Sequence, residues 1–352
     1  PNPDLIEGFV RNRVLMVSGA GGSIGSELAK LIARSLPEKL VLLEANEHAL
    51  YQIDRELRDI GSFHLVPVLG SVTNPQVLDT VLRTHKVDAI FHAAAHKHVP
   101  LVEANVIEGV RNNVFGTRLI AEAAFRHGVK NFVLISTDKA VHPTSVMGAT
   151  KRWAEFIVTH YGNAAIKAGT DQRFCAVRFG NVLGSNGSVV PLFREQIDRG
   201  GPITLTDEKM TRYFMSIHEA AELIVQAGAL SSGDDLFLLE MGEPVRIRDL
   251  AENMVRLAGL SLRTAENPLG DIAITITGMR PGEKLTEELL YEPGLATPTS
   301  QPKILRARRN ASVGSNVLAA LARLERTLEK GDAGKLRAQL FEFVQDTRRE
   351  AR

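Results

Sequence analysis

The chain has 352 residues, 44% of them hydrophobic and 24% charged, which is ordinary for a soluble globular protein with one large domain and a smaller partner. Its 42 basic and 41 acidic residues give a formal net charge of +1. This balance excludes a global electrostatic attraction to nucleic acid or to an anionic membrane, so anionic ligands must be bound by local groups.

Cysteine usage and hydropathy narrow the cellular setting. Cys175 is the only cysteine, so neither an internal disulfide nor a metal cluster of the cysteine type can form, and we expect no bound metal and a reducing, cytoplasmic setting. No apolar run reaches the roughly 18 residues of a spanning helix, so we expect no membrane contact from this segment. The chain opens on Pro1 rather than Met, and we expect it to be part of a longer protein.

The first half of the chain alternates short apolar runs with helical patterns, as βαβ units do. The predicted strands are Val14–Ser18, Lys39–Leu43, His64–Leu69, Ala89–Ala93, Asn131–Ile135 and Phe174–Arg178. The predicted helices begin at Ser23, at Glu47, near Asn74 and at Met147, and a further one runs from about Val102 to Phe125. Right-handed crossovers between such strands predict an α/β fold with a doubly wound parallel sheet.

The second half of the chain is less regular. Its predicted elements are a helix at His218–Leu230, a strand at Leu236–Glu240, a helix at Ile247–Leu257, a strand at Ile272–Thr277 and amphipathic helices at Val317–Leu328 and Ala333–Gln345. We therefore divide the chain into a main domain, a smaller lobe and a helical C-terminal tail. The main domain comprises residues 10–181 with 212–242 returning to it, the lobe 182–211 and 243–300, and the tail 301–352.

A glycine-rich turn links the first predicted strand to the first helix. Gly19 permits a tight turn, Gly22 lets the backbone approach a pyrophosphate, and Gly25 lets the helix pack closely against the strand. The first residues of the helix, Ser23 and Ile24, offer backbone amides to phosphate charge. The spacing is therefore typical of a dinucleotide-binding turn.

A carboxylate, Glu44, ends the second predicted strand, where such domains bind a ribose 2′-hydroxyl. It would repel a 2′-phosphate, and no Arg follows in the next three residues, Ala45-Asn46-Glu47. The main domain is thus predicted to be a Rossmann domain that binds NAD in preference to NADP. A solvated charge at the strand end is the alternative for Glu44.

Small and basic residues follow the fourth predicted strand. Ala93, Ala94 and Ala95 suit a backbone that lies against a cofactor. Lys97 and His98 come directly afterwards, at the carboxyl end of a parallel strand, where such sheets bind ligands. Both are candidates for phosphate or sugar contacts, with a solvated basic loop as the alternative.

Further polar candidates lie on later elements. Asn113, inside a predicted helix, is expected to hold the backbone near the active site, with a simple exposed face as the alternative. Arg194, Arg212 and Arg280 follow loop signals, and arginine forks suit a diphosphate. A surface or structural role is the alternative for each arginine taken singly.

The motifs that carry a family resemblance extend over residues 10–295. They are Gly19-x-x-Gly22-x-x-Gly25, Ala93-Ala-Ala-His-Lys-His-Val-Pro100, Asn113-Val-Phe-Gly-Thr117, Ser136-Thr-Asp-Lys139, Met147-x-x-x-Lys151, Arg178-Phe-Gly-Asn-Val-Leu-Gly184, Met210-Thr-Arg-Tyr-Phe-Met215 and Arg280-Pro-Gly-Glu-Lys284. Together they resemble an extended short-chain dehydrogenase and, more narrowly, the catalytic domain of the bacterial nucleotide-sugar 4,6-dehydratases of polysaccharide and glycan biosynthesis.

The most informative position in this resemblance is Met147. In related dehydrogenases a Tyr four residues before the Lys supplies the proton that accompanies hydride transfer, and here Met147 precedes Lys151. A thioether cannot donate a proton. The Met form resembles the membrane-anchored, C5-retaining UDP-N-acetylglucosamine 4,6-dehydratases, which implies NAD, a UDP-sugar substrate and the cytoplasmic catalytic part of a membrane-anchored protein.

The resemblance implies a catalytic set of Thr137, Asp138, Lys139, Met147 and Lys151. As a hypothesis, Lys139 removes the C5 proton and Asp138 protonates the departing 6-hydroxyl. Thr137 hydrogen-bonds the 4-oxygen, and Lys151 holds the nicotinamide ribose. For the 4-hydroxyl proton we expect a water held by Thr137 and Asp138 to be the acceptor.

The resemblance also implies binding residues. Ser71 and Val72 would lie near the adenine, although the family usually has Asp at the place of Ser71. Asn186 likewise replaces a more usual Arg. The implied substrate contacts are Lys97, His98, Asn181, Arg194, Arg212, Arg280 and Glu283.

Two other readings stay open. One is another enzyme of the same fold, a nucleotide-sugar 4-epimerase or a C5-inverting dehydratase, although epimerases normally require the Tyr that Met147 replaces. The other is a catalytically silent dinucleotide-binding protein. We also expect a homo-oligomer whose subunits pair through helices such as Val102–Phe125 and Met147–Thr159, as in related folds.

Overall fold

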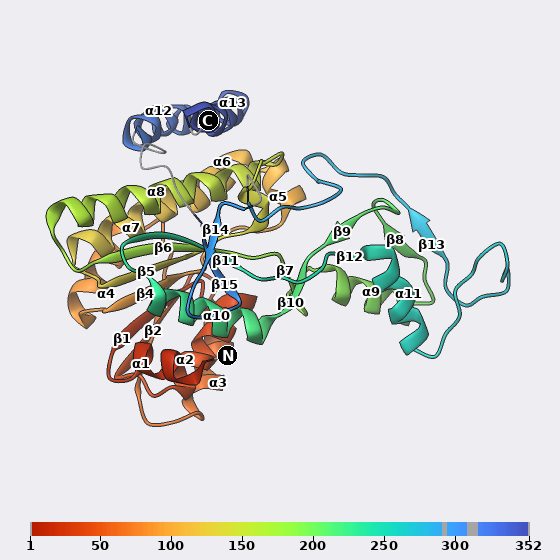
Figure 1. The fold of residues 1–352 in the computed structure, drawn as a ribbon, viewed down its shortest axis with the longest axis horizontal. Coiled ribbons are helices and arrows are strands. Elements are labelled where there is room, and N and C mark those ends of the chain that lie inside the picture. The colour runs from red at the N-terminus through yellow and green to blue at the C-terminus, as the bar shows by residue number, and fades with distance from the viewer. Residues whose placement is uncertain (1, 291–293, 308–315, 351–352) are drawn as a thin grey trace.

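A computed structural model describes residues 2–290, 294–307 and 316–350, and a nine-stranded sheet forms its centre (Figure 1). The strand order is β14-β15-β11-β6-β5-β4-β1-β2-β3. The strands are β1 Val14–Ser18, β2 Lys39–Glu44, β3 His64–Leu69, β4 Ala89–His92, β5 Asn131–Ile135, β6 Arg173–Arg178, β11 Asp234–Leu239, β14 Ala296–Pro298 and β15 Ile304–Ala307. From β3 to β11 all neighbours are parallel.

This sheet confirms the predicted doubly wound α/β fold. The chain order reverses between β1 and β4, which are direct neighbours, and the carboxyl ends of strands at such a reversal form a ligand-binding crevice. β1 is buried along its whole length because its apolar run is covered on both faces of the sheet.

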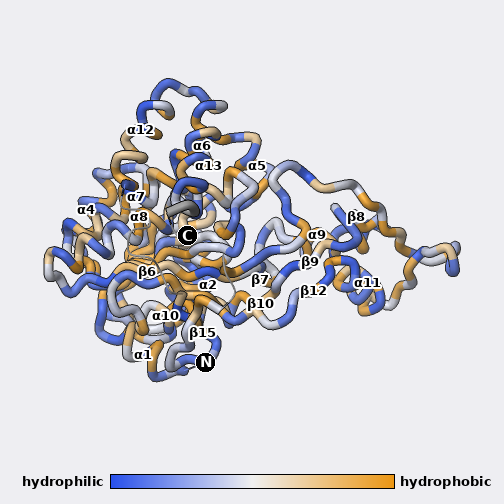
Figure 2. Tube along the Cα trace, turned by 45° about the horizontal axis from the view of Figure 1, so that its top comes forward, coloured by the Kyte–Doolittle hydropathy of each residue, from blue (hydrophilic) through white to orange (hydrophobic). Residues whose placement is uncertain are grey.

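Helices cover both faces of the sheet and create an apolar core on each. One face carries α1 Pro3–Val10, α2 Ser23–Arg34, α3 Glu47–Arg58 and α10 Ile217–Leu230. The other carries α4 Pro75–His85, α7 Gly116–Arg126 and α8 Val146–Ala168 (Figure 1). Figure 2 shows the hydrophobic residues concentrated along the central strands between these layers.

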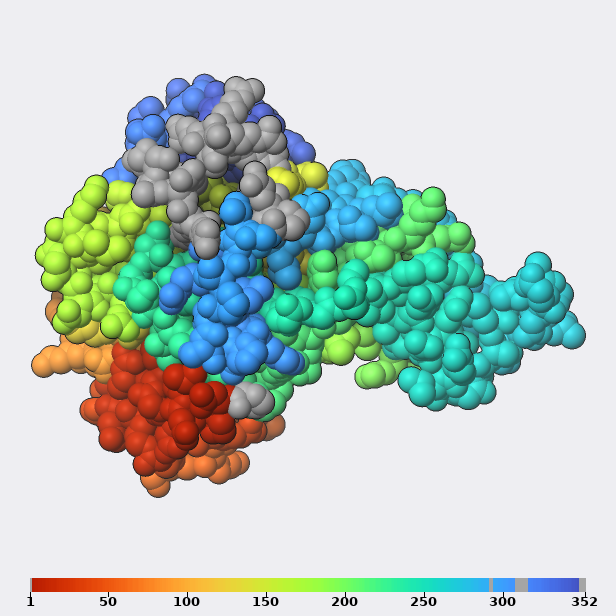
Figure 3. Space-filling view, viewed as in Figure 1, coloured from red at the N-terminus to blue at the C-terminus, as the bar shows by residue number. Residues whose placement is uncertain are grey.

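A smaller lobe projects from the main body (Figure 3). It has its own apolar core and consists of α9 Val189–Asp198, α11 Ile247–Leu257 and the short strands β8 Ile203–Leu205, β9 Thr211–Arg212, β12 Val245–Arg246 and β13 Ile274–Ile276. β7 Asn181–Leu183 pairs with β10 Phe214–Ser216. Most of these strands are too short for the sequence to show an alternating pattern, and the sequence analysis missed all of them except β13.

The single helix predicted from Val102 to Phe125 is wrong. The segment consists of α5 Val99–Ala104, α6 Val106–Gly109, a π-helical turn η1 Val110–Phe115 and α7. The break falls at Asn105, whose side-chain amide donates to the Leu101 carbonyl at 2.8 Å and so caps the end of α5. A π-helical turn is rare and frequently marks a functional site.

The boundary between lobe and tail also needs correction. Residues 296–307 were assigned partly to the lobe and partly to a helical tail, yet β14 and β15 lie at the edge of the main sheet. β15 pairs antiparallel with β11, with Phe237 opposite Arg306, and Arg306 donates to the Leu230 carbonyl at 2.9 Å. Short edge strands of this kind carry little periodic signal.

The tail helices α12 Val317–Glu329 and α13 Ala333–Glu350 pack over α8 (Figure 1). Trp153 on α8 donates from Nε1 to the Leu340 carbonyl at 3.0 Å, and its ring lies 4.4 Å from that of Phe343. The chain's own tail therefore covers part of the α8 surface that we expected to pair between subunits. In the described part of the chain, no helix has both the length and the apolar character needed to cross a membrane.

Replacing Trp153 tests this packing. Trp153 is buried, so Trp153→Ala should lower the free energy of unfolding by about 3–5 kcal/mol through cavity formation and loss of the hydrogen bond. The free energy is measured by urea titration of fluorescence or circular dichroism. Leu318→Ala, at an exposed position of α12, should change it by no more than about 0.5 kcal/mol. Equal, small effects in both variants would mean that the tail does not pack on α8.

His92, the last residue of β4, is a buried neutral histidine. Its Nδ1 lies 2.7 Å from Ser18 Oγ and its Nε2 lies 2.9 Å from Thr117 Oγ1. Because the Thr117 hydroxyl donates to the Asn113 carbonyl, it accepts from Nε2–H, and Nδ1 accepts from Ser18. Burial, and secondarily the charge of Lys151, lowers the pKa of His92 to about 3.

This lowered pKa predicts a loss of stability in acid. The unfolded chain protonates His92 below about pH 6.5, whereas the folded chain resists protonation down to about pH 3, so the contribution of His92 is present above 6.5 and lost as the pH falls. Between pH 7 and pH 5 the loss should be about 2 kcal/mol. Over the same pH interval, urea titrations should show that the free energy of unfolding falls by about 2 kcal/mol less in His92→Gln than in the wild type. Equal losses would contradict a neutral buried His92.

Candidate active site

A cavity of about 660 Å³ opens at the carboxyl ends of β1, β4 and β5. Many of the residues predicted to bind cofactor or substrate or to act in catalysis line it: Gly22, Ser23, Ile24, Gly25, Ala93, Ala95, Lys97, His98, Thr137, Lys139, Met147, Lys151 and Asn181. The structure thus gathers segments that are far apart in the sequence at the reversal of strand order, as the sheet topology requires.

The glycine turn is packed too tightly for larger residues. Gly19 has a φ of +68°, and a Cβ there would lie 2.7 Å from the backbone nitrogen of Ala94. A Cβ on Gly25 would lie 1.9 Å from the Gly19 carbonyl oxygen. α2 begins directly after Gly22, which has no side chain to cap the helix. The first residues of α2 line the cavity, and their uncapped backbone amides are suited to bind an anion.

Glu44 supports this turn from the end of β2. Its Oε1 accepts from the Gly21 amide at 2.9 Å and its Oε2 accepts from the Asn46 amide at 3.0 Å. A carboxylate oxygen accepts more than one hydrogen bond, so Glu44 can still receive a ribose hydroxyl. Ser71 and Val72 follow the end of the neighbouring strand β3, and, like Glu44, they lie outside the lining of the cavity. Their predicted contacts with a cofactor stay predictions.

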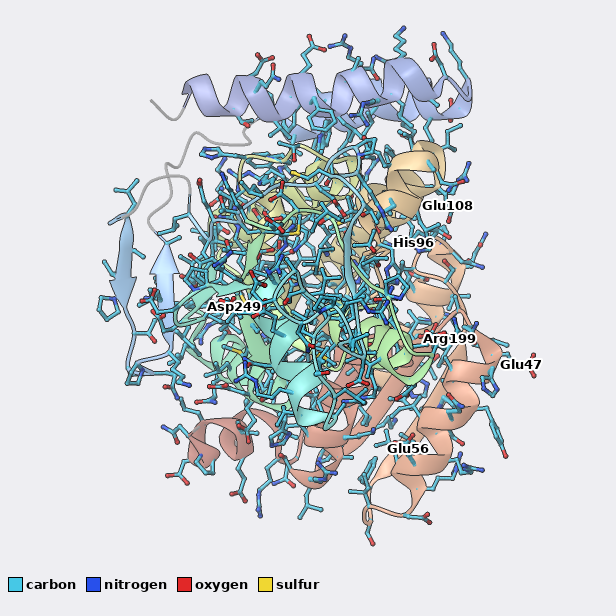
Figure 4. The ribbon with its side chains drawn as sticks, turned by 90° about the vertical axis from the view of Figure 1, so that its right-hand side faces the viewer. Glu47, Glu56, His96, Glu108, Arg199 and Asp249 are labelled. Atoms are coloured by element: carbon cyan, nitrogen blue, oxygen red, sulfur yellow. The ribbon has the colours of Figure 1, made fainter. Side chains whose placement is uncertain are left out.

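Asn113 holds the backbone after β4, as predicted. Its Oδ1 accepts from the His96 amide at 2.8 Å, and its Nδ2 donates to the His96 carbonyl at 3.0 Å and to Thr150 Oγ1 at 3.1 Å. The side chain of His96 lies beside Glu108 at the rim of the cavity, with Nε2 3.2 Å from Oε1 (Figure 4). Asn113 therefore fixes the loop that carries Lys97 and His98, and a direct cofactor contact stays a prediction.

Asp138 and Lys139 form an ion pair in which the aspartate is fully buried and the lysine is partly exposed. Asp138 has no exposed side-chain area, and its Oδ1 accepts from Thr137 Oγ1 and from Lys139 Nζ, both at 3.1 Å. Lys139 Nζ also donates to Asn181 Oδ1 at 3.3 Å. Asp138 Oδ2 is buried without a hydrogen-bond partner. These groups are thus enclosed and close enough to exchange protons.

Gly148 brings this ion pair against α8. A Cβ at position 148 would lie 2.3 Å from the Lys139 carbonyl oxygen, so only glycine permits the contact. Met147 and Lys151 lie on either side of Gly148, are both buried and face the cavity. Burial lowers the pKa of Lys151 to about 8, against the opposing effect of the Glu155 carboxylate.

A buried ionic cluster locks α8 to the ends of β5 and β6. Glu155 accepts from Arg178 Nε and Nη2 at 2.7 and 2.6 Å, from Ser136 Oγ at 2.6 Å and from Arg152 Nη1 at 2.8 Å. Burial alone would raise the pKa of Glu155, but the charge of and hydrogen bonds from Arg178, with Arg152 and Ser136, hold it well below its usual range. Ser136 immediately precedes the catalytic candidates, so this cluster fixes their backbone.

A second cavity, of about 860 Å³, lies between the main body and the lobe. Both cavities are lined by Lys139, Asn181 and His98, so they meet at the Asp138–Lys139 pair. Arg212, Arg280 and Glu283 line the second cavity, as expected for groups that contact one ligand. Glu283 Oε2 accepts from the Arg280 amide at 3.1 Å and thereby shapes the turn.

Two of the predicted arginines are placed differently from expectation. Arg194 is exposed on α9 and lines neither cavity, so the structure does not bring it to the site. Arg212 lines the second cavity, but its Nη1 and Nη2 donate to the carbonyls of Thr211, Lys284 and Leu285. Arg212 therefore holds the loop that carries Arg280 and Glu283.

Glu287 is a site residue that could not be recognised from the sequence. This carboxylate is buried, lines the second cavity and lies 3.5 Å from Lys284 Nζ. Its only sequence signal is the spacing of three residues after Lys284, and the adjacent Glu288 makes the pair resemble a solvated acidic patch. Gly148 was also passed over because a single glycine inside a helix carries no specific signal.

Comparison with known proteins relates the chain to polysaccharide biosynthesis. Residues 15–309 match the family model described as polysaccharide biosynthesis protein. The capsular polysaccharide biosynthesis protein CapD of Staphylococcus aureus is 47% identical over 306 residues, which cover 86% of this chain and 49% of that protein. The chain thus spans about half the length of this relative.

More distant relatives have named reactions. A UDP-N-acetylglucosamine 4,6-dehydratase (inverting) of Campylobacter jejuni is 29% identical over 278 residues, covering 78% of this chain and 77% of that protein. A UDP-glucose 4-epimerase of Rickettsia prowazekii is 30% identical over 290 residues, which cover 81% of this chain and 80% of that protein. The two reactions named by these relatives are thus matched about equally well.

Solved structures share the architecture. Pen from Bacillus thuringiensis is 30% identical, with a TM-score of 0.77 over 86% of this chain and 90% of that chain. The dTDP-glucose 4,6-dehydratase DesIV of Streptomyces venezuelae, solved with NAD bound, is 22% identical. Its TM-score is 0.65, and the match covers 78% of this chain and 88% of that chain. The chain belongs to the polysaccharide biosynthesis protein family and has the extended short-chain dehydrogenase fold of nucleotide-sugar dehydratases and epimerases.

Proposed function

We propose that the chain catalyses the NAD-dependent 4,6-dehydration of a UDP-sugar, with UDP-N-acetylglucosamine as the substrate and a UDP-4-keto-6-deoxy-N-acetylhexosamine as the product. The observation that carries the proposal is the ion pair between the buried Asp138 and Lys139 at the junction of the two cavities, with Met147 in place of a proton donor. An elimination needs an acid and a base beyond those of a simple oxidation. An epimerisation does not.

The residues around the first cavity fit NAD. The glycine turn leaves no room for a Cβ at positions 19 and 25, the start of α2 presents free amides, and Glu44 provides a carboxylate at the end of β2. Lys151 would hold the nicotinamide ribose. When bound, the cofactor would accept a hydride from C4 of the sugar and return it to C6.

The second cavity fits the nucleotide part of the substrate. Arg280 is the arginine there whose guanidinium is available for a diphosphate, and Glu283 can accept ribose hydroxyls. Lys97, His98 and Asn181 lie where this cavity meets the first, which would place the sugar beside Lys139. The dehydratase of Campylobacter jejuni supports a UDP-N-acetylhexosamine as the substrate class.

The chemistry follows from the order in which protons are needed. Oxidation at C4 creates a ketone that acidifies the C5 proton, and Lys139 is placed to remove it once its own proton has moved to Asp138, 3.1 Å away. Asp138 then protonates the departing 6-hydroxyl, and Thr137 steadies the 4-oxygen. If Lys139 also returns the proton to C5, the proton is added to the face from which it left, so C5 retains its configuration.

The product assay tests this proposal. The purified chain with NAD and UDP-N-acetylglucosamine should yield a product lighter by one water, seen by mass spectrometry, with C5 configuration retained in NMR spectra recorded in heavy water. An isomer of unchanged mass would support the epimerase alternative, and an inverted C5 would support the inverting dehydratase. No change at all would support a silent dinucleotide-binding protein.

Lys139→Met should lower the dehydration rate by at least about a hundredfold, because the base is lost while the glycine turn is untouched. NAD affinity, measured by calorimetry, should stay the same. Lys130→Met is the matched control, since Lys130 also pairs with an aspartate, Asp171 at 3.8 Å, but lies at an exposed site away from both cavities. Full activity of Lys139→Met would rule out the assigned base.

The charge of Lys151 predicts an alkaline limit to activity. Because burial lowers its pKa to about 8, Lys151 is charged below that pH and neutral above it. We expect kcat/KM to fall as the pH rises through about 8, since the ammonium no longer binds the ribose or stabilises nearby negative charge. Lys151→Arg, which stays charged, should remove this limb of the profile. A wild-type profile that stays level well above pH 8 would contradict the assignment.

A further inference from the structure

Glu287 is a buried carboxyl group that lines the second cavity together with Lys139. Its side chain is only 3% exposed, and Oε2 has no hydrogen-bond partner, although Lys284 Nζ lies 3.5 Å away. Asp138 Oδ2, on the main body, is likewise buried without a partner. The site therefore holds two carboxyl groups that each have one buried oxygen without a hydrogen-bond partner, and such an oxygen is costly to bury and free to accept a proton.

The charged groups around Glu287 come from several elements. Lys139 and Asp138 face it from the turn after β5, Lys284 lies on its own segment, and Arg212 lies on β9. Burial raises the pKa of Glu287, and so does the charge of Asp138, whereas Lys139, Lys284 and Arg212 act in the opposite direction. A carboxylate with a raised pKa is a better proton acceptor near neutral pH than an ordinary one.

We propose that Glu287 accepts the proton of the substrate 4-hydroxyl and so takes the place of the missing tyrosine. This inference rests on the proposed dehydratase function. It replaces the water that we expected in this role with a side chain of the protein, and it makes the lobe a contributor to the chemistry as well as to binding.

The protons balance around this assignment. At rest, Asp138 and Glu287 are ionised and Lys139 is charged. As C4 is oxidised, the 4-hydroxyl proton would move to Glu287 and the Lys139 proton to Asp138, leaving a neutral amine. Lys139 then takes the C5 proton while Asp138 protonates O6, and the C5–H and C6–O bonds break to release water.

The second half of the cycle restores the starting state. As C6 is reduced, Lys139 would give its proton back to C5. Lys139 is then neutral and Glu287 is protonated, so a transfer between these two neighbours regenerates the resting charges. Every proton taken up is released, and no oxidant other than NAD is needed.

Glu287→Gln tests the assignment, because glutamine keeps the size of the side chain but cannot accept the proton. Rapid mixing of the NAD-loaded chain with UDP-N-acetylglucosamine reports hydride transfer as NADH absorbance. We expect its rate to fall about a hundredfold, and the isotope effect of deuterium at C4 on turnover to increase, with UDP affinity unchanged. Glu288→Gln is the matched control, since Glu288 is adjacent but exposed, 3.4 Å from His142, and should change the rate less than twofold.

The pH dependence provides a second measurement that needs no variant. NADH formation by the wild type should fall as the pH drops through the pKa of Glu287, because the protonated carboxyl group cannot accept another proton. Glu287→Asp, which keeps the carboxyl group, should recover part of the rate lost in Glu287→Gln. Without substrate, ¹³C NMR of glutamate-labelled chain should show one carboxyl signal titrating above the usual range, absent in Glu287→Gln.

The outcomes separate this inference from the proposed function. An active wild type with an equally active Glu287→Gln overturns the role of Glu287 alone, and so does a rate of NADH formation that does not change with acidic pH. A wild type that forms neither NADH nor a dehydrated product from UDP-N-acetylglucosamine overturns the proposed function, and the inference with it. Loss of rate in Glu287→Gln with an unchanged C4 isotope effect would indicate a merely structural residue.

Discussion

The close approach of α8 to the turn after β5 is the constraint on which the rest of the site depends. Gly148 lets the Lys139 carbonyl lie where a side chain would otherwise be, and this contact determines where the turn sits. Two turns further along the helix, Glu155 binds Ser136 and Arg178. Breaking a buried ion pair of this kind is strongly destabilising, because the remaining charge is left without compensation. The sheet ends and the helix are therefore fixed as one unit.

The same end of α8 also organises the lobe and the tail. Thr144 Oγ1 donates to the Gly282 carbonyl at 3.0 Å, and Lys284 Nζ donates to the Val141 carbonyl. A Cβ on Gly282 would lie 2.8 Å from Ser145 Cβ, so the lobe segment contacts the start of the helix directly. These contacts join the Arg280–Glu287 segment to the turn after β5 and so hold Glu287 near Lys139.

The tail reaches this point as well. Arg337 on α13 pairs with Glu103, whose other oxygen accepts from the Val146 amide at 2.8 Å at the first turn of α8. A carboxylate at a helix N-terminus is favoured by the helix dipole as well as by this hydrogen bond. The tail thus helps to fix the helix that carries Met147 and Lys151, in addition to covering Trp153.

The sequence was informative where a local pattern determines the structure. The buried strand at Val14–Ser18 and the glycine turn after it could be predicted because periodicity and the spacing of glycines have direct geometric meaning. The break at Asn105 depends on one side-chain hydrogen bond, and β15 depends on a distant partner, so neither has a local signal. Glu287 is the clearest case, since only the folded lobe distinguishes it from the exposed Glu288.

The position of Met147 is best understood from how the titratable groups are distributed. The residues of α8 that line the first cavity are Met147 and Lys151. Asp138, Lys139 and Glu287 lie close together where the second cavity begins. A dehydration needs its acid and base at C5 and C6 in any case. In the dehydration that we propose, one more carboxyl group beside them receives the 4-hydroxyl proton, so no phenol is needed next to Lys151. In that scheme Met147, one helical turn before Lys151, adds no polar group beside this lysine, whose burial is the main cause of its lowered pKa.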